Sequence, residues 1–334
     1  MTVTQHRSLP AADNAPGARA AAIIGVLTVL IALVAIAFAL PATRSGPHQV
    51  PIGAAGPQAA GGQVARILDE QAPGAFTLSY FPDEAALRDA IHDRAVYGGL
   101  VLPERPGTPP TMLIATGGSP AVAQVLTQVS AGMGAHLGAT VPVEDVVPPT
   151  ADDPRGAGLA ASALPITLAG ILPAVALFLA LPGRRLLQLG AGVTFAVVSG
   201  VTLAVVLRFV LGSIDQNFWG VTAALTLGIA AALVLMLGLG AVFGRAGLAA
   251  GALLALLVGN PLSGLVTAPE MLPAGWGTLG QLLPQGATAT LLRSAAAFGG
   301  AGSVAAVVVL SCWIIAGIAL VGVAGFRTAA TSSR

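Results

Sequence analysis

Long apolar stretches separated by short segments dominate this sequence. A helix needs about 20 apolar residues to cross the hydrocarbon layer of a bilayer. Such stretches occur six times, at Ala20 to Leu40, about Ala157 to Leu181, Leu186 to Leu207, Trp219 to Phe243, Leu248 to Ala268 and Ser303 to Phe326. Because 55% of the 334 residues are hydrophobic and only 9% are charged, a soluble fold has no interior large enough for them. The sequence predicts a polytopic α-helical membrane protein with six transmembrane helices.

The first apolar stretch has two interpretations. Arg19 precedes it, as a basic residue precedes the apolar core of a cleaved signal peptide. Such a core typically has about 7–15 residues, and the stretch from Ala20 to Leu40 is longer. This length favours an uncleaved membrane anchor over a signal peptide.

The positions of the basic residues predict the orientation of the helices. No lysine occurs, and the arginines that flank the apolar stretches fall at alternate ends of them: Arg7, Arg19, Arg184, Arg185, Arg245, Arg327 and Arg334. Basic residues close to membrane helices are enriched on the cytoplasmic side. We therefore expect cytoplasmic tails at residues 1–19 and 327–334. Every acidic residue except Asp13 then falls in a segment assigned to the outer side, which is consistent with this topology.

More than a hundred residues separate the first two apolar stretches. Residues 41–156 begin with a Pro/Gly/Ala-rich linker and end with another around Pro148 to Pro154. Between the linkers, the residue patterns predict a strand, a helix, two strands and a helix, at Phe76 to Phe81, Asp83 to Arg94, Val96 to Leu102, Met112 to Thr116 and Ser119 to about Leu137. The sequence thus predicts a small extracytoplasmic α/β domain.

Chemical motifs of enzymes are missing from the sequence. A phosphate-binding loop of the Walker type needs a lysine, and neither a G-x-S-x-G nor an H-E-x-x-H pattern occurs. Asp89, His92 and Asp93 lie close together on one predicted helix, but alternating charges there are typical of a solvated face. We therefore expect no enzymatic activity, no cofactor and no metal. The net charge of +1 gives no attraction to nucleic acid, so the expected surroundings are a lipid bilayer.

Prolines and glycines interrupt the apolar sequence from Asn260, near the end of the fifth stretch, to the start of the sixth. It contains N-P-L-S-G from Asn260, P-E-M-L-P from Pro269 and L-P-Q-G from Leu283. A straight helix cannot continue through these residues, and non-helical backbone at membrane depth requires cover by protein or a water-filled cavity. Residues 269–300 are therefore predicted to form a pair of short re-entrant or interfacial helices.

This segment resembles the end of the membrane subunits of type 2 ABC transporters. The resemblance lies in N-P-L-S-G-L-V-T-A-P-E-M-L-P-A-G-W, in L-P-Q-G-A and in the arginine after two leucines, Arg293. The outer segment D-E-A-A-L-R-D-A-I-H-D-R-A-V-Y-G-G-L-V-L-P is similar to a helix-strand unit of the outer domains of that family. Many members also have one span, a large outer domain and five further spans. The resemblance covers most of the chain through short motifs.

The resemblance implies a permease subunit of an ABC-2-type exporter in a bacterial plasma membrane. Such a subunit moves a hydrophobic or amphipathic substrate outward, using energy from a separate ATP-binding cassette ATPase chain. It pairs with a second copy or with a similar subunit. A related group with the same layout, implicated in phage infection and in scaffolding of secretion systems, fits the short inner loops. That group implies the alternative of a non-transporting scaffold or receptor whose outer domain binds a protein partner.

Two sets of residues are candidates for function. The first lies in or beside the re-entrant segment and would line a pathway: Asn260, Pro261, Gly264, Pro269, Glu270, Pro273, Pro284 and Arg293. Its acid, Glu270, and its base, Arg293, would pair, line the outer mouth, or only anchor helix ends at the membrane surface. The second set is the inner loop Pro182, Gly183, Arg184 and Arg185, which is either an ATPase docking point or only a topology signal.

Overall fold

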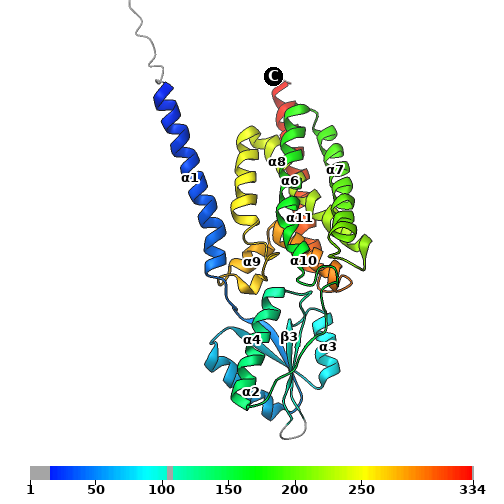
Figure 1. Cartoon of the computed structure of the whole chain (residues 1–334). Helices are drawn as coiled ribbons and strands as arrows, with labels where there is room; N and C mark the ends of the chain where they lie inside the picture. Colours follow the sequence, from blue (N-terminus) through cyan, green and yellow to red (C-terminus); the bar gives the residue numbers. More distant parts are fainter. Residues whose placement is uncertain (1–15, 104–107, 333–334) are drawn as a thin grey trace, which may run out of the picture.

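The chain folds into a bundle of apolar helices with a small α/β domain at one end (Figure 1). The computed structural model describes residues 16–103 and 108–332. The predicted cytoplasmic segment 1–15, with Arg7 and Asp13, and the last two residues lie outside the described ranges. The described ends of the chain lie at the end of the bundle opposite the α/β domain (Figure 1).

Within the described residues, five helical segments are long and apolar enough to cross a membrane. They are α1 (Pro16–Thr43), α5 with α6 (Ala157–Ala161 and Ala163–Ala180), α7 with the π-helical turn η1 (Arg185–Val205 and Val206–Val210), α8 with the π-helical turn η2 (Phe218–Leu254 and Ala255–Gly259), and α11 (Val304–Ser332). These segments support the predicted multi-pass membrane protein. The fourth and fifth predicted stretches both fall largely within α8 and η2.

Helix α8 reverses direction at Gly244. This residue has φ 62° and ψ −144°, a conformation that glycine adopts without a steric penalty. The two halves pack against each other, since Gly251 lies against the Met236 side chain and Gly240 against Leu248. The prediction of two helices that are separated between residues 243 and 248 therefore matches the path of the backbone. The second of these helices ends at Gly259 and not at Ala268, where the fifth stretch was expected to end.

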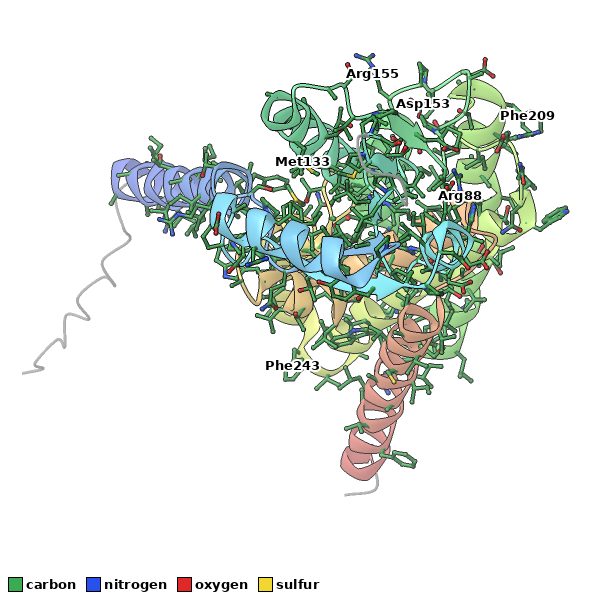
Figure 2. All side chains as sticks on the ribbon, turned by 90° about the horizontal axis from the view of Figure 1, so that it is seen from below. Arg88, Met133, Asp153, Arg155, Phe209 and Phe243 are labelled. Atoms are coloured by element: carbon green, nitrogen blue, oxygen red, sulfur yellow. The ribbon has the colours of Figure 1, made fainter. Side chains whose placement is uncertain are left out.

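The centre of the bundle is α8, which contacts α6, α7, α10 and α11. Small residues permit this packing: Gly317 of α11 lies directly against the Val234 backbone, and Gly238 lies against Gly317. Helix α1 differs, because its main contact is with η2 and Figure 1 shows it standing away from the other helices. Large apolar side chains such as Phe209 and Phe243 point outward from the bundle (Figure 2) and are 73% and 61% exposed. Such a surface suits contact with lipid.

The α/β domain is called the outer domain below, after the side of the membrane predicted for it. It contains a five-stranded sheet with helices on both faces. The strand order is β2-β1-β3-β4-β5, and only the β3–β4 pair is antiparallel. The strands are β1 (Val50–Ala55), β2 (Phe76–Phe81), β3 (Gly98–Val101), β4 (Thr111–Ile114) and β5 (Val143–Asp145). The helices α2 (Gln58–Gln71) and α4 (Pro120–Leu137) cover one face, and α3 (Glu84–His92) covers the other.

The start of the outer domain is not the linker that its composition suggests. Its residues form β1 and α2, and β1 lies inside the sheet between β2 and β3. The strand expected at Phe76 to Phe81 is present with those bounds, and the other four expected elements are β3, β4, α3 and α4 with ends shifted by a few residues. The short strand β5 was not expected.

The outer domain packs against the segment that prolines and glycines interrupt. This segment, residues 260–303, is called the interrupted segment below. This segment contains a 3₁₀ turn, η3 (Pro269–Met271), and two short helices, α9 (Trp276–Gln281) and α10 (Pro284–Ala297). Two short helices therefore occur where the sequence predicts a pair. The second linker also contacts the bundle, because Thr150 donates a hydrogen bond to the carbonyl of Gly212 and Asp153 accepts bonds from the first amides of α5.

Candidate functional site

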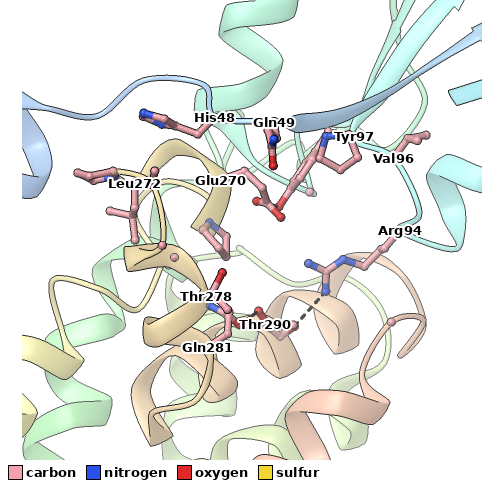
Figure 3. A pocket seen from close by; sticks show the side chains of 18 of the residues that line it. His48, Gln49, Arg94, Val96, Tyr97, Glu270, Leu272, Thr278, Gln281 and Thr290 are labelled. Carbon is pink, nitrogen blue, oxygen red and sulfur yellow. Dashed lines mark hydrogen bonds between the residues drawn. The ribbon is translucent and has the colours of Figure 1, made fainter. Parts of the chain in front are cut away.

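A cavity of about 880 Å³ lies between the outer domain and the interrupted segment (Figure 3). The outer domain contributes polar side chains of Gln49, Arg94 and Tyr97, and the segment contributes those of Glu270 and Gln281. The polar residues His48, Thr278 and Thr290 also line it, together with prolines, glycines and a few larger apolar side chains such as Val96 and Leu272. The cavity thus has a mixed polar and apolar wall built from two parts of the chain that are far apart in sequence.

Arg94 enters the cavity from the outer domain, directly after the end of α3. Its Nη1 donates hydrogen bonds to the carbonyl of Thr290, at 3.1 Å, and to the hydroxyl of Ser294, both in α10. Its guanidinium lies over the Phe298 ring, 5.3 Å from the centroid. Burial lowers the pKa of Arg94, and the nearby Tyr97 and Glu270 oppose that shift. These contacts fix one edge of the guanidinium against α10.

Glu270 faces the cavity from the interrupted segment. The Tyr97 hydroxyl donates a 2.7 Å hydrogen bond to Oε2 of Glu270, and the backbone N–H of His48 donates to the carbonyl of the same residue. Burial and the Glu270 charge raise the pKa of Tyr97, so the phenol keeps its proton and remains a donor. In the described part of the chain, no ion pair joins Glu270 to Arg94 or Arg293. Glu270 is therefore held by the outer domain through hydrogen bonds and not through an ion pair.

Arg293 of α10 lies behind the cavity wall. It is 3% exposed, and its two terminal nitrogens donate to the carbonyls of Gly264, Leu265 and Thr267. The shortest of these bonds, to Leu265, measures 2.8 Å. Arg293 therefore binds the non-helical backbone that connects η2 to η3. It does not line the cavity.

The candidate pathway residues separate into three groups in the structure. Pro269, Glu270 and Pro273 line the large cavity. Asn260, Pro261 and Gly264 line a second cavity of about 360 Å³ between the C-terminal end of α1 and the N-terminal end of α6. Pro284 and Arg293 are buried in α10, where Pro284 occupies the first turn. Both cavities border the interrupted segment, and Leu272 lines each of them.

Residues of the outer domain that line the large cavity were not singled out from the sequence. Arg94 was expected as the last residue of an amphipathic helix and Tyr97 as part of a strand, both within the segment that carries the family resemblance, but neither was assigned to a site. Their partners Ser294 and Glu270 lie 200 and 173 positions away. The local sequence shows a charged helix end followed by the buried strand β3. This change predicts a loop at Arg94, but it does not predict which residues contact that loop.

The candidate docking loop lies at the other end of the bundle. Pro182, Gly183 and Arg184 are exposed in the four-residue connection from α6 to α7, residues 181–184, and Arg185 is the first residue of α7. Gly183 has φ 74°, which fits a tight turn. This connection contains no helix.

The large cavity offers recognition of charge by the Arg94 guanidinium and the Glu270 carboxylate, with the His48 imidazole also in its lining. The described residues contain no group of three or more histidine, cysteine, aspartate or glutamate side chains that could hold a metal ion. Comparison with protein-family models, with curated proteins and with solved structures gave no match.

Proposed function

We infer that this chain is the membrane-spanning permease subunit of an ABC-2-type exporter, which moves a hydrophobic or amphipathic substrate outward with energy from a separate ATPase chain. The observation that carries the proposal is the placement of the outer domain over the interrupted segment, with a large cavity of mixed polarity between them. A substrate with an apolar part and a polar part suits such a wall.

Six membrane crossings with both termini in the cytoplasm form part of this proposal. Contacts support it, because Asn217, just before α8, donates to the carbonyl of Ala295 in α10, and the cavity joins α10 to the outer domain. The chain then runs away from the outer domain, reverses at Gly244 and returns to the interrupted segment. In this proposal the cytoplasmic end is the end of the bundle opposite the outer domain, where α6 connects to α7 and where α8 reverses (Figure 1).

The second cavity provides a lateral route in this proposal. Phe38 of α1 and Leu164 of α6 line it, together with Val266 and Leu272 of the interrupted segment. Because α1 stands away from the rest of the bundle, lipid reaches this cavity from the membrane. An amphipathic molecule would enter there and pass the interrupted segment to the large cavity. Pairing with a second copy or a similar subunit would cover the exposed helix faces.

Purification of the tagged chain in mild detergent tests the proposal. We expect a nucleotide-binding chain to co-purify and ATPase activity to appear in the same sample. A double variant, Pro182→Ala with Arg184→Ala, should lose that chain, whereas the matched outer variant Arg155→Ala should retain it. A pure preparation with neither the second chain nor ATPase activity would contradict the exporter proposal.

A scaffold or receptor function is the second candidate, and the cytoplasmic connections favour it. In the described residues these are the connection at 181–184 and the turn at Gly244, which offer little surface for an ATPase. In this function the outer α/β domain binds a protein partner. Replacement of residues 46–152 by a short flexible linker should abolish partner capture while the helices still insert. Stopping at residue 152 preserves Asp153, which caps α5. Unchanged capture would exclude this candidate.

A further inference from the structure

Arg94 has hydrogen-bonding capacity that the described residues do not use. A guanidinium carries five N–H donors, and only Nη1 of Arg94 has hydrogen-bond partners, in α10. The edge formed by Nε and Nη2 has no hydrogen-bond partner among residues 16–103 and 108–332, although burial lowers the pKa of the group. Two parallel N–H donors on one edge match the geometry of a carboxylate or phosphate. Arg94 thus presents the N–H groups of Nε and Nη2 as a pair of donors, a fork, in the wall of the large cavity (Figure 3).

The backbone of Arg94 gives an independent indication. Its φ is 61°, in the left-handed region, at a helix end where glycine or asparagine usually occurs. A side chain with a Cβ is strained there by about 1 kcal/mol or more. A glycine would end α3 without this strain but would place no guanidinium in the cavity. The strain is therefore consistent with a requirement for the arginine side chain.

A carboxylate lies across the cavity from this fork. Oε2 of Glu270 accepts the Tyr97 hydroxyl, and Oε1 has no hydrogen-bond partner among the described residues. Arg94 and Glu270 both point into the cavity, from the outer domain and from the interrupted segment respectively (Figure 3). Because no ion pair joins them, each charge remains available to a ligand. A purely anionic ligand would meet repulsion from Glu270, and a purely cationic ligand would meet repulsion from Arg94.

We propose that the large cavity binds a zwitterion that carries an oxyanion and a primary ammonium group, with the oxyanion on the free edge of Arg94 and the ammonium on Glu270. A phosphoethanolamine headgroup has this chemistry, either free or as part of a lipid. The volume of about 880 Å³ exceeds the size of that headgroup and leaves room for the start of the apolar chains beside Val96 and Leu272. The inference rests on the proposed function, because it assigns a chemical class to the amphipathic substrate.

Calorimetric titration of the purified full chain in phosphatidylcholine nanodiscs tests this site. The probes are dihexanoyl phosphatidylethanolamine, dihexanoyl phosphatidylglycerol and free phosphoethanolamine. We expect the ethanolamine lipid to bind about tenfold more tightly than the glycerol lipid, which has the phosphate but no ammonium. Binding of free phosphoethanolamine as tightly as the lipid would identify the headgroup as the whole ligand, and weaker binding would identify the lipid. Equal affinities for the two lipids would overturn the proposal.

Variants separate the two charges. Arg94→Gln should weaken binding of both lipids about tenfold or more, and Arg155→Gln, an exposed charge-matched control, should leave both affinities unchanged. Glu270→Gln keeps an acceptor for Tyr97 and should reduce only the preference for the ethanolamine lipid, whereas Glu70→Gln should not. If Arg94→Gln does not fold, Arg94→Lys, which keeps the charge without the fork, should bind with intermediate affinity. Wild-type affinity in Arg94→Lys would contradict the fork geometry.

These measurements need no ATPase partner. Selective binding of the ethanolamine lipid together with failure to recover an ATPase would reject the exporter and keep the site. Recovery of an ATPase with no selectivity between lipids would keep the exporter and reject the site.

Discussion

Arg293 binds a short stretch of backbone, residues 264–267, whose carbonyls are not bonded within a helix. The carbonyls of Gly264, Leu265 and Thr267 point inward beside α10, and the guanidinium accounts for one hydrogen bond or more at each of them. A buried carbonyl without a donor is destabilising, so this arginine is required for the non-helical path. The guanidinium provides several N–H donors at one point. Its structural role is to stabilise the non-helical backbone of the interrupted segment.

Substitution of Arg293 should therefore lower stability strongly. Arg293→Met fills a similar volume but leaves the carbonyls of Gly264 and Leu265 without a side-chain donor, and that of Thr267 with only the Ser119 hydroxyl, which we expect to cost about 3 kcal/mol or more. Arg293→Lys reaches fewer of the carbonyls and should give an intermediate loss. Thermal unfolding of the detergent-solubilised variants, followed by loss of the monodisperse species, measures the effect. Arg155→Met serves as the exposed control, and an equal change in both variants would contradict the assigned role.

Arg88 connects α3 to the edge strand β5 through a salt bridge with Glu144. Its guanidinium donates to Glu84 and to Glu144, with the shortest nitrogen–oxygen distance to each at 2.6 Å. The hydrogen bond with Arg88 lowers the pKa of Glu144, and that of Arg88 is raised by the same bond. Both partners are substantially exposed, so the contribution to stability is small.

The pH dependence of this contact has a definite sign. A carboxylate with a lowered pKa in the folded state stabilises the fold above its unfolded pKa, and this contribution disappears as the pH falls through the folded pKa. We expect Arg88→Gln to be slightly less stable than the wild-type chain at neutral pH, with a difference that shrinks towards about pH 3. Thermal unfolding at several pH values measures it. A difference that grows on acidification would contradict the assignment.

The sequence indicated Glu270 and Arg293 because they are isolated charges in an apolar segment. It could not distinguish their roles, since the partners of Arg293 are backbone carbonyls and a carbonyl has no sequence signature. Glu270 lines the cavity, but its partner Tyr97 comes from another domain. A pairwise contact across 173 positions is invisible to local patterns. The isolated charges therefore indicated the interrupted segment in the sequence. Only the structure shows that Glu270 lines the large cavity and that Arg293 does not.

At the scale of elements, β1 shows why composition misleads. Its sequence V-P-I-G-A-A is typical of a linker, yet it is an interior strand of the sheet. Small residues are required there: a side chain on Gly53 would overlap with Leu87 of α3, and one on Gly99 would overlap with the backbone of Gly53. The strand is therefore glycine-containing because a helix and a neighbouring strand approach it closely. The amphipathic helices α3 and α4 have no such ambiguity and were predicted well.

The interrupted segment has the same dependence on close backbone contact. A Cβ on Gly280 of α9 would overlap with the carbonyl oxygen of Leu262, so Gly280→Ala should destabilise the chain by about 1–3 kcal/mol. Gly132 in α4 has no heavy atom within 4 Å of its Cβ position, and Gly132→Ala should stabilise by about 0.5–1 kcal/mol. Thermal unfolding of the two variants should therefore show shifts of opposite sign. A neutral Gly280→Ala would show that α9 does not pack as described.

At the scale of the whole molecule, the proposed six-span topology depends on the path of α8. Apolar residues continue from Phe218 to Gly259 with Arg245 as an interruption, so hydropathy alone fits either one long helix or two short ones. The reversal at Gly244 and the contacts of Glu270 and Thr290 with the outer domain support the two passes that the proposed six-span topology requires. A single pass would put residues 270 and 290 on the opposite side of the membrane from their partners Tyr97 and Arg94.

Cysteine labelling in intact cells tests this topology. The single native cysteine, Cys312, is first replaced by serine. Single cysteines are then placed at the exposed positions Asp89 and Thr278, which should react with a membrane-impermeant maleimide added outside, and at Pro182 and Ala246, which should react only after permeabilisation. Asp89 and Pro182 act as references for the two sides. Because the Tyr97–Glu270 contact requires residue 278 to lie on the same side as the outer domain, labelling of Thr278→Cys only after permeabilisation would exclude both the six-span topology and the cavity that the outer domain closes.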